Sequence, residues 1–457
     1  MSDHMQPTSI EVLARWIEVE LDRQQTVFGL PAAVFHRPWS GDGFAIQHAG
    51  SRLDTPFGVA AGPHTQLAQN LVCAYLAGAR FIELKTVQTL DRIDVSKPCI
   101  DMQDVGYNCE WSQELRIEQS FEEYLKAWIL IHWLRQRLDL GRGPDAGLLF
   151  NMSVGYDLEG IGQDKVQWFL DRMHAAGQRR LELLRSAATA VAGMADVEVP
   201  DQLSDSVTLS TMHGCPPDEI ERIGRYLIEQ RGLHTAIKLN PTLLGPERLR
   251  HILHGELGFD DIAVPDAAFE HDPDFAAGVD MVRSLQAAAD KAGVRFWVKL
   301  TNTLETRNLR RVLPEHEPMH YMSGRALHPL AVQLAADLTA AAERPLAVSL
   351  SGGADAFNSP DLLASGLGPV TVCSDLLRPG GYGRLSQYLE RLGERMQLAG
   401  AADLFEFGCR RAQAADDGGR RLEALLRQRL ASLVGRGRAG RAEIGRASCR
   451  ERVCHRV

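Results

Sequence analysis

A cysteine stands where the chain changes from a predicted strand to a predicted helix. The segment reads TLSTMHGCPPDEIERI over residues 208–223, with Cys215 between a glycine and two prolines. Proline suits the first turn of a helix, and a helix N-terminus favours the thiolate form of cysteine. His213 is close enough in sequence to help lower the pKa of the thiol. Three interpretations stay open for Cys215: a catalytic residue, a metal ligand, or a small buried apolar residue.

Three lysines stand at the ends of other apolar runs. They are Lys85 in RFIELKT, Lys238 in TAIKLN and Lys299 in RFWVKLTN. A buried lysine is rare unless it is paired or functional. One of the three is a candidate for a Schiff base, as in barrel aldolases. The alternative is contact with an anionic flavin ring and its ribityl chain.

A glycine pair and a serine end two later apolar runs. Gly352-Gly353 follows LAVSLS, and Ser374 follows VTVC. Paired glycines expose backbone N–H groups that bind anions, whereas the alternative is a plain turn. In a (β/α)8 barrel the phosphate site lies after the seventh and eighth strands. The pattern therefore favours a phosphate site here.

Alternating short apolar runs and longer amphipathic stretches position these residues. Apolar strands separated by helices indicate a parallel sheet covered on both faces, either closed into a (β/α)8 barrel or open and doubly wound. In the barrel, the C-terminal ends of the strands carry the site. Nine strand candidates compete for eight places, so we expect 260–264 or 148–154 to lie outside the barrel. The nine are 55–62, 80–86, 148–154, 207–212, 235–240, 260–264, 295–302, 346–353 and 369–375.

The predicted helices and the remaining segments divide the chain. Apolar spacing of three and four predicts helices at 8–25, 65–77, 114–139, 163–193, 217–231, 246–254, 277–292, 329–342 and 382–395. Residues 87–147 form a long insertion after strand two, which we expect to cover the site. Its Trp128 and Trp133 share one helix face and are expected in the core.

We predict one domain over residues 1–398, followed by two segments of a different kind. Residues 399–442 are Arg- and Ala-rich and are either helical or out of frame. Residues 443–457 include EIGRASCRERVC, one back-translation of which resembles a sequencing adapter, so they are expected to be an artefact. The natural protein is then expected to continue beyond this fragment.

Composition excludes several classes of protein. Hydrophobic residues make up 45% and charged residues 24% of the 457, which is ordinary for a globular protein. The net charge of −9 argues against nucleic-acid binding. No run of eighteen apolar residues predicts a membrane span, and the first residues do not form a signal peptide, so a cytoplasmic location is expected. No C-x-x-C occurs, and we predict no metal site.

The motifs resemble two groups of known proteins. TPFGVAAG, FIELKT, the CP at 215–216, IKL, TNT, YMSGRALHPLA, SGG and VCSD follow the order found in dihydroorotate and dihydropyrimidine dehydrogenases, which are FMN-binding (β/α)8 barrels. Longer stretches, among them AAGPHTQLAQN, FIELKTVQ, LSTMHGCPP and KLNPTLLG, resemble the YgfK-type family, whose members carry the name "putative selenate reductase subunit". This second resemblance extends to about residue 398.

The resemblance implies an FMN-dependent oxidoreductase barrel of the CH-CH dehydrogenase type. It assigns Cys215 as the catalytic general base, with Lys85 and Lys238 beside the reacting groups. It implies that the following residues bind FMN: Ala60, Ala61, Gly62, Lys85, Thr86, Lys238, Asn302, Thr303, Ser323, Gly324, Gly352, Gly353 and Ser374. Candidates for contact with a small planar substrate are Asn108, Asn151 and His213.

The sequence also departs from the dehydrogenase pattern. Met212 stands where those enzymes have an asparagine three residues before the cysteine. The resemblance implies iron–sulfur clusters, FAD and NAD(P)H in a C-terminal part that this chain does not contain, and other redox subunits or domains as partners. Two alternatives stay open: a catalytically inactive barrel that serves as a scaffold, and a lysine-dependent aldolase-type barrel.

Overall fold

Eight parallel strands close into a barrel in the computed structural model, which describes residues 5–39, 41–90, 97–103, 105–109, 114–141, 146–210, 215–270, 272–309, 311 and 313–413. The strands follow chain order around the barrel, and β16 pairs with β5 to close it. They are β5 (Phe57–Val59), β6 (Phe81–Glu83), β9 (Leu149–Val154), β10 (Ser206–Ser210), β11 (His234–Leu239), β12 (Phe296–Leu300), β15 (Val348–Leu350) and β16 (Val370–Val372). The closed (β/α)8 prediction is confirmed.

The surplus strand candidate is 260–264. Residues 148–154 hold β9 inside the barrel, whereas 260–264 form no strand. There the backbone N–H of Ile262 bonds back to Phe259, and Ile262 and Val264 are buried. The apolar pattern of this segment reflects packing of a loop and was misleading as evidence for a strand.

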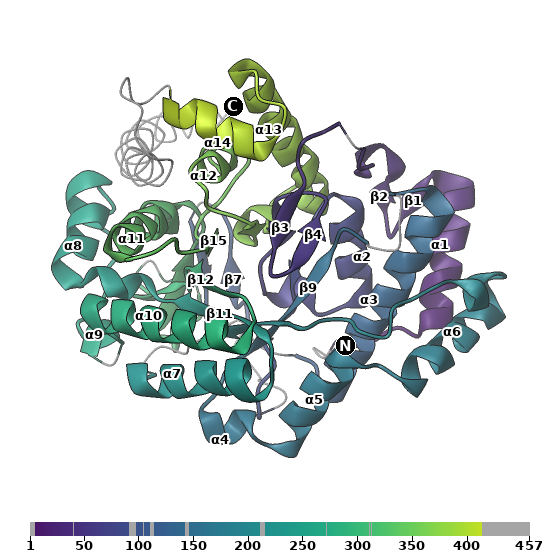
Figure 1. Ribbon diagram of the computed structural model, residues 1–457, viewed down its shortest axis with the longest axis horizontal. Coiled ribbons are helices and arrows are strands. Elements are labelled where there is room, and N and C mark those ends of the chain that lie inside the picture. The colour runs from purple at the N-terminus through teal and green to yellow at the C-terminus, as the bar shows by residue number, and fades with distance from the viewer. Residues whose placement is uncertain are drawn as a thin grey trace.

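Helices connect successive strands and surround the barrel (Figure 1). The predicted helix over 163–193 is two helices, because the chain breaks at Gly177, where φ is +59°. The helices are α1 (Ile10–Gln24), α2 (Ala68–Leu76), α3 (Ile117–Leu138), α4 (Leu158–Ile161), α5 (Asp164–His174), α6 (Gln178–Ala190), α7 (Pro217–Arg225), α8 (Pro246–Arg250), α9 (Ala267–Glu270), α10 (Phe275–Ala292), α11 (Leu327–Ala341), α12 (Ser359–Ala364), α13 (Leu385–Ala399) and α14 (Leu404–Gln413).

Antiparallel strands cover both ends of the barrel. At the N-terminal end, His48 of the hairpin β3 (Ile46–His48) and β4 (Ser51–Leu53) packs edge-on against Phe81 and Trp297. Over the C-terminal end, β7 (Ile100–Asp101) and β8 (Gly106–Asn108) join β13 (Leu304–Arg307) and β14 (Met319–Ser323) in one sheet, in the order β13-β14-β8-β7. A small two-stranded sheet of β1 (Thr26–Val27) and β2 (Leu30–Pro31) follows α1.

The four-stranded covering sheet shows that the insertion is shorter than the predicted 87–147. Within residues 87–147, α3 is the ordinary connection between β6 and β9, and only the part before it is additional. A second additional segment, β13–β14 after β12, was not predicted, because a short hairpin inside a long connection carries no period of its own. Trp128 and Trp133 of α3 are buried, as predicted.

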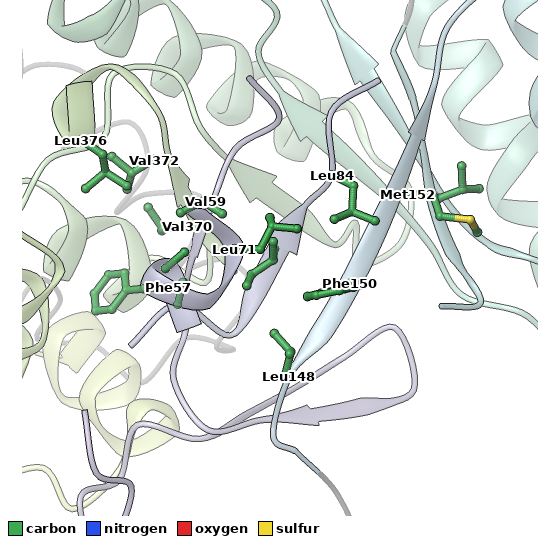
Figure 2. Close-up of a cluster of buried hydrophobic side chains, with 14 of the residues drawn as sticks. Phe57, Val59, Leu71, Leu84, Leu148, Phe150, Met152, Val370, Val372 and Leu376 are labelled. Carbon is green, nitrogen blue, oxygen red and sulfur yellow. The ribbon is translucent and has the colours of Figure 1, made fainter. Parts of the chain in front are cut away.

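Apolar side chains fill the space between the strands and the surrounding helices. Figure 2 shows part of this core, with Phe57 and Val59 of β5 in register with Val370 and Val372 of β16. The strands are buried on both faces, which explains their continuous apolar runs. Polar residues are therefore confined to the strand ends and to a few paired positions in the barrel interior.

Candidate functional site

A buried carboxylate organises the interior of the barrel below the C-terminal rim. Glu83, the last residue of β6, is 1% exposed and forms an ion pair with Lys299 of β12. Its second oxygen accepts the backbone N–H of Ala61 at 3.2 Å. Thr371 links the pair by accepting from Lys299 at 2.5 Å and donating to Glu83 at 3.3 Å. The ion pair thus fixes the loop that follows β5.

The three lysines singled out in the sequence surround this carboxylate in different ways. Burial lowers the pKa of Lys299 to about 8, although the charge of Glu83 opposes the shift. Lys238 of β11 is half-buried, and burial lowers its pKa, while the charges of Glu83 and Cys373 oppose the shift. Lys85 is buried directly after β6, and its backbone carbonyl accepts from the hydroxyl of Tyr124 at 3.2 Å.

The loop after β5 lies against two groups that the sequence reasoning missed. A Cβ placed on Gly62 would lie 3.2 Å from Sγ of Cys373 and 2.9 Å from the ring of His64. Cys373 Sγ and His64 Nδ1 are 3.8 Å apart. Burial lowers the pKa of His64 to about 4, and the charge of Lys85 acts in the same direction. Ala60 is buried and donates to Val372 at 3.0 Å, whereas Ala61 is half-buried.

Segments after β14, β15 and β16 converge on one small cradle. Ser374 donates to Ser323 at 3.0 Å between the hydroxyl oxygens. A Cβ on Gly353 would lie 2.3 Å from the carbonyl oxygen of Gly324 and 2.9 Å from His328. Gly324 and Gly353 have φ values of +71° and +64°. Glycine is required at both positions, because an L side chain is strained there and Gly353 has no space for one.

Two arginines lie near this cradle and were also missed by sequence reasoning. Arg325 directly follows Gly324, and Arg378 follows the 3₁₀ turn Ser374–Leu377. Burial and the charge of Arg378 lower the pKa of Arg325, while Asp355 opposes the shift. Positive charge beside a cradle of glycine and serine residues suits an anion. Gly352 is adjacent, and its carbonyl lies 3.3 Å from Nδ1 of His328.

A chain of hydrogen bonds connects the rim at β11 and β12 with the neighbourhood of Cys215. Asn302 donates to the side-chain oxygen of Asn240 at 2.7 Å and to the backbone carbonyl of Lys238 at 3.4 Å. Asn240 in turn donates to Asp272 at 2.9 Å. The charge of Asp272 is one of four that act on Cys215. Thr303 is half-buried beside Asn302.

Cys215 is a protonated thiol, contrary to the expectation from its place before a helix. It is half-buried two residues before α7, and burial raises its pKa to about 11. The carboxylates of Glu219, Asp218, Asp157 and Asp272 act in the same direction. Burial and the four negative charges together raise the thiol pKa, so the prediction of a lowered thiol pKa was wrong in sign. His213 and Met212 lie outside the described residues.

The remaining candidates fall in three places. Asn151 is fully buried in β9, where its amide bonds Thr208 at 2.7 Å and Ser206 at 2.6 Å, so its side chain serves barrel packing. Asn108 lies in the covering sheet and donates to the carbonyl of Tyr321 at 3.2 Å. Thr86 is on the rim and begins a hydroxyl row through Ser153 and Ser210, at 2.8 Å and 3.0 Å.

The observed residues fit a flavin mononucleotide. The cradle of Gly324, Gly353 and the paired serines suits a phosphate, and a Cβ at Gly353 would fill it. Within the described part of the chain, Nε2 of His64 is buried and makes no hydrogen bond, so the rim offers an unused polar atom beside the Gly62 loop. No group of three or more metal-ligating side chains occurs among the described residues.

The closed eight-stranded parallel barrel, with polar residues at the C-terminal ends of its strands, places the chain in the class of (β/α)8-barrel proteins. The family model "Oxidoreductase YgfK, N-terminal TIM-barrel domain" matches residues 28–414. The chain belongs to the YgfK oxidoreductase family and corresponds to its N-terminal TIM-barrel domain.

Relatives and solved structures agree with this assignment. "Putative oxidoreductase YgfK" of Escherichia coli K12 and of Escherichia coli O157:H7 are each 44% identical over 414 residues, or 86% of this chain. The match spans 39% of those proteins, so the chain corresponds to about two fifths of their length. A ligand-free DHODH from Eimeria tenella has the same fold, with a TM-score of 0.50 and 15% identity over 86% of this chain and 97% of that one. No helix in the described ranges is both long and apolar enough to cross a membrane.

Proposed function

We propose that this barrel binds FMN at the C-terminal ends of its strands and uses it to dehydrogenate or reduce a small planar substrate. The observation that carries the proposal is the cradle in which Ser374 bonds Ser323 and Gly324 closely approaches Gly353. It lies after β14, β15 and β16, where barrels of this kind hold phosphate. Ala60, Ala61 and Gly62 would then hold the flavin ring.

The chain's own residues supply orientation and charge around that ring. When bound, FMN supplies hydride transfer to or from a substrate carbon. Lys238 and Lys85 provide positive charge at the rim, and Glu83 fixes the Ala61 N–H at 3.2 Å. Asn302 is fixed by Asn240 at 2.7 Å, with Thr303 and Thr86 as further polar groups at the same rim. Lysine side chains at this rim suit an anionic ligand.

Cys215 is proposed to transfer the proton that accompanies the hydride. Its pKa of about 11 keeps the thiol protonated at neutral pH, so it suits proton donation to a substrate being reduced. In the opposite direction, proton abstraction by Cys215 needs the thiolate, whose fraction rises about tenfold per pH unit below the pKa. Oxidation of substrate should therefore accelerate toward alkaline pH, while reduction should not.

The cofactor assignment is tested by the spectrum of purified protein and by the mass of the released cofactor. Flavin absorption with about one FMN per chain supports the proposal. Colourless protein that also fails to take up added FMN refutes it. The proton-transfer role is tested separately in flavin-loaded Cys215→Ser protein. Unchanged flavin reduction by every accepted substrate would show that Cys215 does not transfer the proton.

The two alternatives are less well supported by the structure. A Schiff base at Lys299 would break its ion pair with the buried Glu83, which disfavours the aldolase mechanism at that lysine. Borohydride trapping with a carbonyl substrate would detect such an adduct at Lys238 or Lys299. A scaffold role requires no cofactor, and its mark would be a colourless protein that still binds its partner domains.

The wider setting follows from the length of the relatives. We propose that the barrel passes electrons to redox subunits or domains carrying iron–sulfur clusters, FAD and NAD(P)H in a larger cytoplasmic enzyme. The match to 39% of the curated relatives leaves room for such domains. No feature of the described residues selects selenate, so the selenate reductase role stays attached to the family name alone. The division into a barrel over 1–398 and two further segments is likewise proposed. The helix α14 belongs to the second segment and packs against α12 and α13 of the barrel segment.

A further inference from the structure

Two cysteines face each other across the hairpin of the covering sheet. Ile100 pairs with Asn108 and Asp101 with Tyr107 in the antiparallel ladder of β7 and β8. The same register places Cys99 directly opposite Cys109. The backbone N–H of Cys109 donates to the carbonyl of Cys99 at 2.9 Å, which extends the ladder to this pair. Both side chains therefore project from the same face of the hairpin.

The geometry of such a pair is compatible with a disulfide. Directly opposed residues that share a backbone hydrogen bond have Cα atoms about 5.5 Å apart, within the range of about 4.4–6.8 Å found for disulfides. Their Cβ atoms, about 5.5 Å apart in a hydrogen-bonded pair, need to approach by about 1–2 Å. β7 is a two-residue strand at the edge of its sheet and can accommodate that shift. Both cysteines are in the thiol form in the structure.

The two thiols differ in access. Cys109 is 7% exposed, whereas Cys99 is half-buried and is reachable by a small disulfide in solution. We propose that Cys99 and Cys109 form a reversible disulfide by exchange with a low-molecular-weight disulfide such as oxidised glutathione. This redox site is separate from the proposed flavin chemistry and holds whether or not FMN binds.

The exchange balances without a further reactant. The Cys99 thiolate attacks the glutathione disulfide, whose S–S bond breaks, and one glutathione leaves as a thiolate. The Cys109 thiolate then attacks the Cys99 sulfur and displaces the second glutathione. The protein loses two thiol hydrogens, and one glutathione disulfide becomes two glutathione molecules. Burial and Glu114 raise the pKa of Cys99 while Lys97 opposes them, so the rate should rise about tenfold between pH 7 and pH 8.

Mass spectrometry of the full chain tests the proposal. After incubation with oxidised glutathione at pH 8, the protein is alkylated and digested with trypsin, which releases both cysteines in the single peptide 93–116. The expected product is this peptide with neither cysteine alkylated and two hydrogens lost, restored by dithiothreitol. Cys73→Ser, at a deeply buried cysteine, is the matched control and should leave the product unchanged.

Two results would overturn it. In wild-type protein, alkylation of both cysteines, or accumulation of one glutathione adduct beside one alkylated cysteine, would show that the pair does not close. The variants Cys99→Ser and Cys109→Ser should each abolish the loss of two hydrogens; persistence of that loss in either variant would place the oxidation elsewhere. These readouts are independent of flavin content, so failure here leaves the proposed function untouched.

Discussion

Gly353→Ala should disrupt the cradle, because two separate costs meet at that position. An alanine at φ +64° costs about 1–2 kcal/mol in the left-handed region. Its Cβ would lie 2.3 Å from a backbone oxygen of Gly324, and overpacking of this kind costs about 1–3 kcal/mol. The free energy of unfolding of the apoprotein should therefore fall by about 2–5 kcal/mol.

The same change should weaken FMN binding. Relief of the contact with Gly324 has to move the backbone that is proposed to receive the phosphate. Loss of one hydrogen bond to a charged group costs about 1.5–3 kcal/mol, which raises Kd about 10- to 100-fold. Urea unfolding of the apoprotein measures the first effect, and titration of flavin fluorescence measures the second.

Two other glycines separate the causes. Gly381 has φ +51°, and a Cβ added there would have nothing within 4 Å, so Gly381→Ala should show the backbone cost alone, about 1–2 kcal/mol. Gly383 has neither constraint, so Gly383→Ala should be close to neutral. A Gly353→Ala protein that unfolds like Gly383→Ala and keeps its Kd for FMN within about twofold would refute the role of the cradle.

Further expectations concern the buried charges. Lys299→Met leaves the carboxylate of Glu83 buried without its ion pair, so the free energy of unfolding, measured in urea, should fall by about 3 kcal/mol. Adding Glu83→Gln should recover part of this loss. A Lys299→Met protein with an unchanged free energy of unfolding would contradict the expectation. Four histidines of the described ranges stay neutral in the fold because burial lowers their pKa to about 3 or 4, while the unfolded chain binds protons below pH 6.5. The free energy of unfolding should therefore fall as pH drops from 6.5 toward 4, by up to about 1.4 kcal/mol per pH unit for each histidine. The variant His48→Phe should reduce this slope of free energy against pH by about a quarter, if the four histidines contribute equally. A pH-independent free energy of unfolding in that window would contradict the assignment. The four are His36, His48, His64 and His132.

Local sequence was sufficient to locate the barrel strands because they are buried on both faces, whereas it left open whether the sheet closes. Runs such as TPFGVAAG and RFWVKLTN have to be apolar throughout, and amphipathic stretches separate them. The same pattern was misleading at 260–264, where a buried loop has the composition of a strand. It also gave no sign of β13 and β14, since strands of four and five residues inside a connection show no distinct period.

At the candidate site, the sequence indicated which residues to select better than it indicated their ion-pair partners or the direction of their pKa shifts. Gly353 and Ser374 could be selected because glycine pairs and strand-end serines have a direct chemical meaning. Glu83 was missed, because an isolated acid in an apolar run shows its role only once Lys299 is found opposite it. The thiol of Cys215 was given the wrong direction of pKa shift, because the main cause is burial, which only the tertiary structure decides, and the nearby acids Glu219 and Asp218 add to it.

The sequence by itself determined the alternation of strands and helices and the small, polar and cationic residues at the strand ends. Those properties depend on neighbours within a few residues, so the local pattern carries them. Tertiary structure decided which side chains meet: Lys299 with Glu83, Ser374 with Ser323, and Cys99 with Cys109. Closure of the barrel and pairing across its cover bring together groups more than 300 residues apart, such as Cys373 and His64, which are separated by 309 residues in the chain. The electrostatic effects of such groups depend on distance in space and on burial.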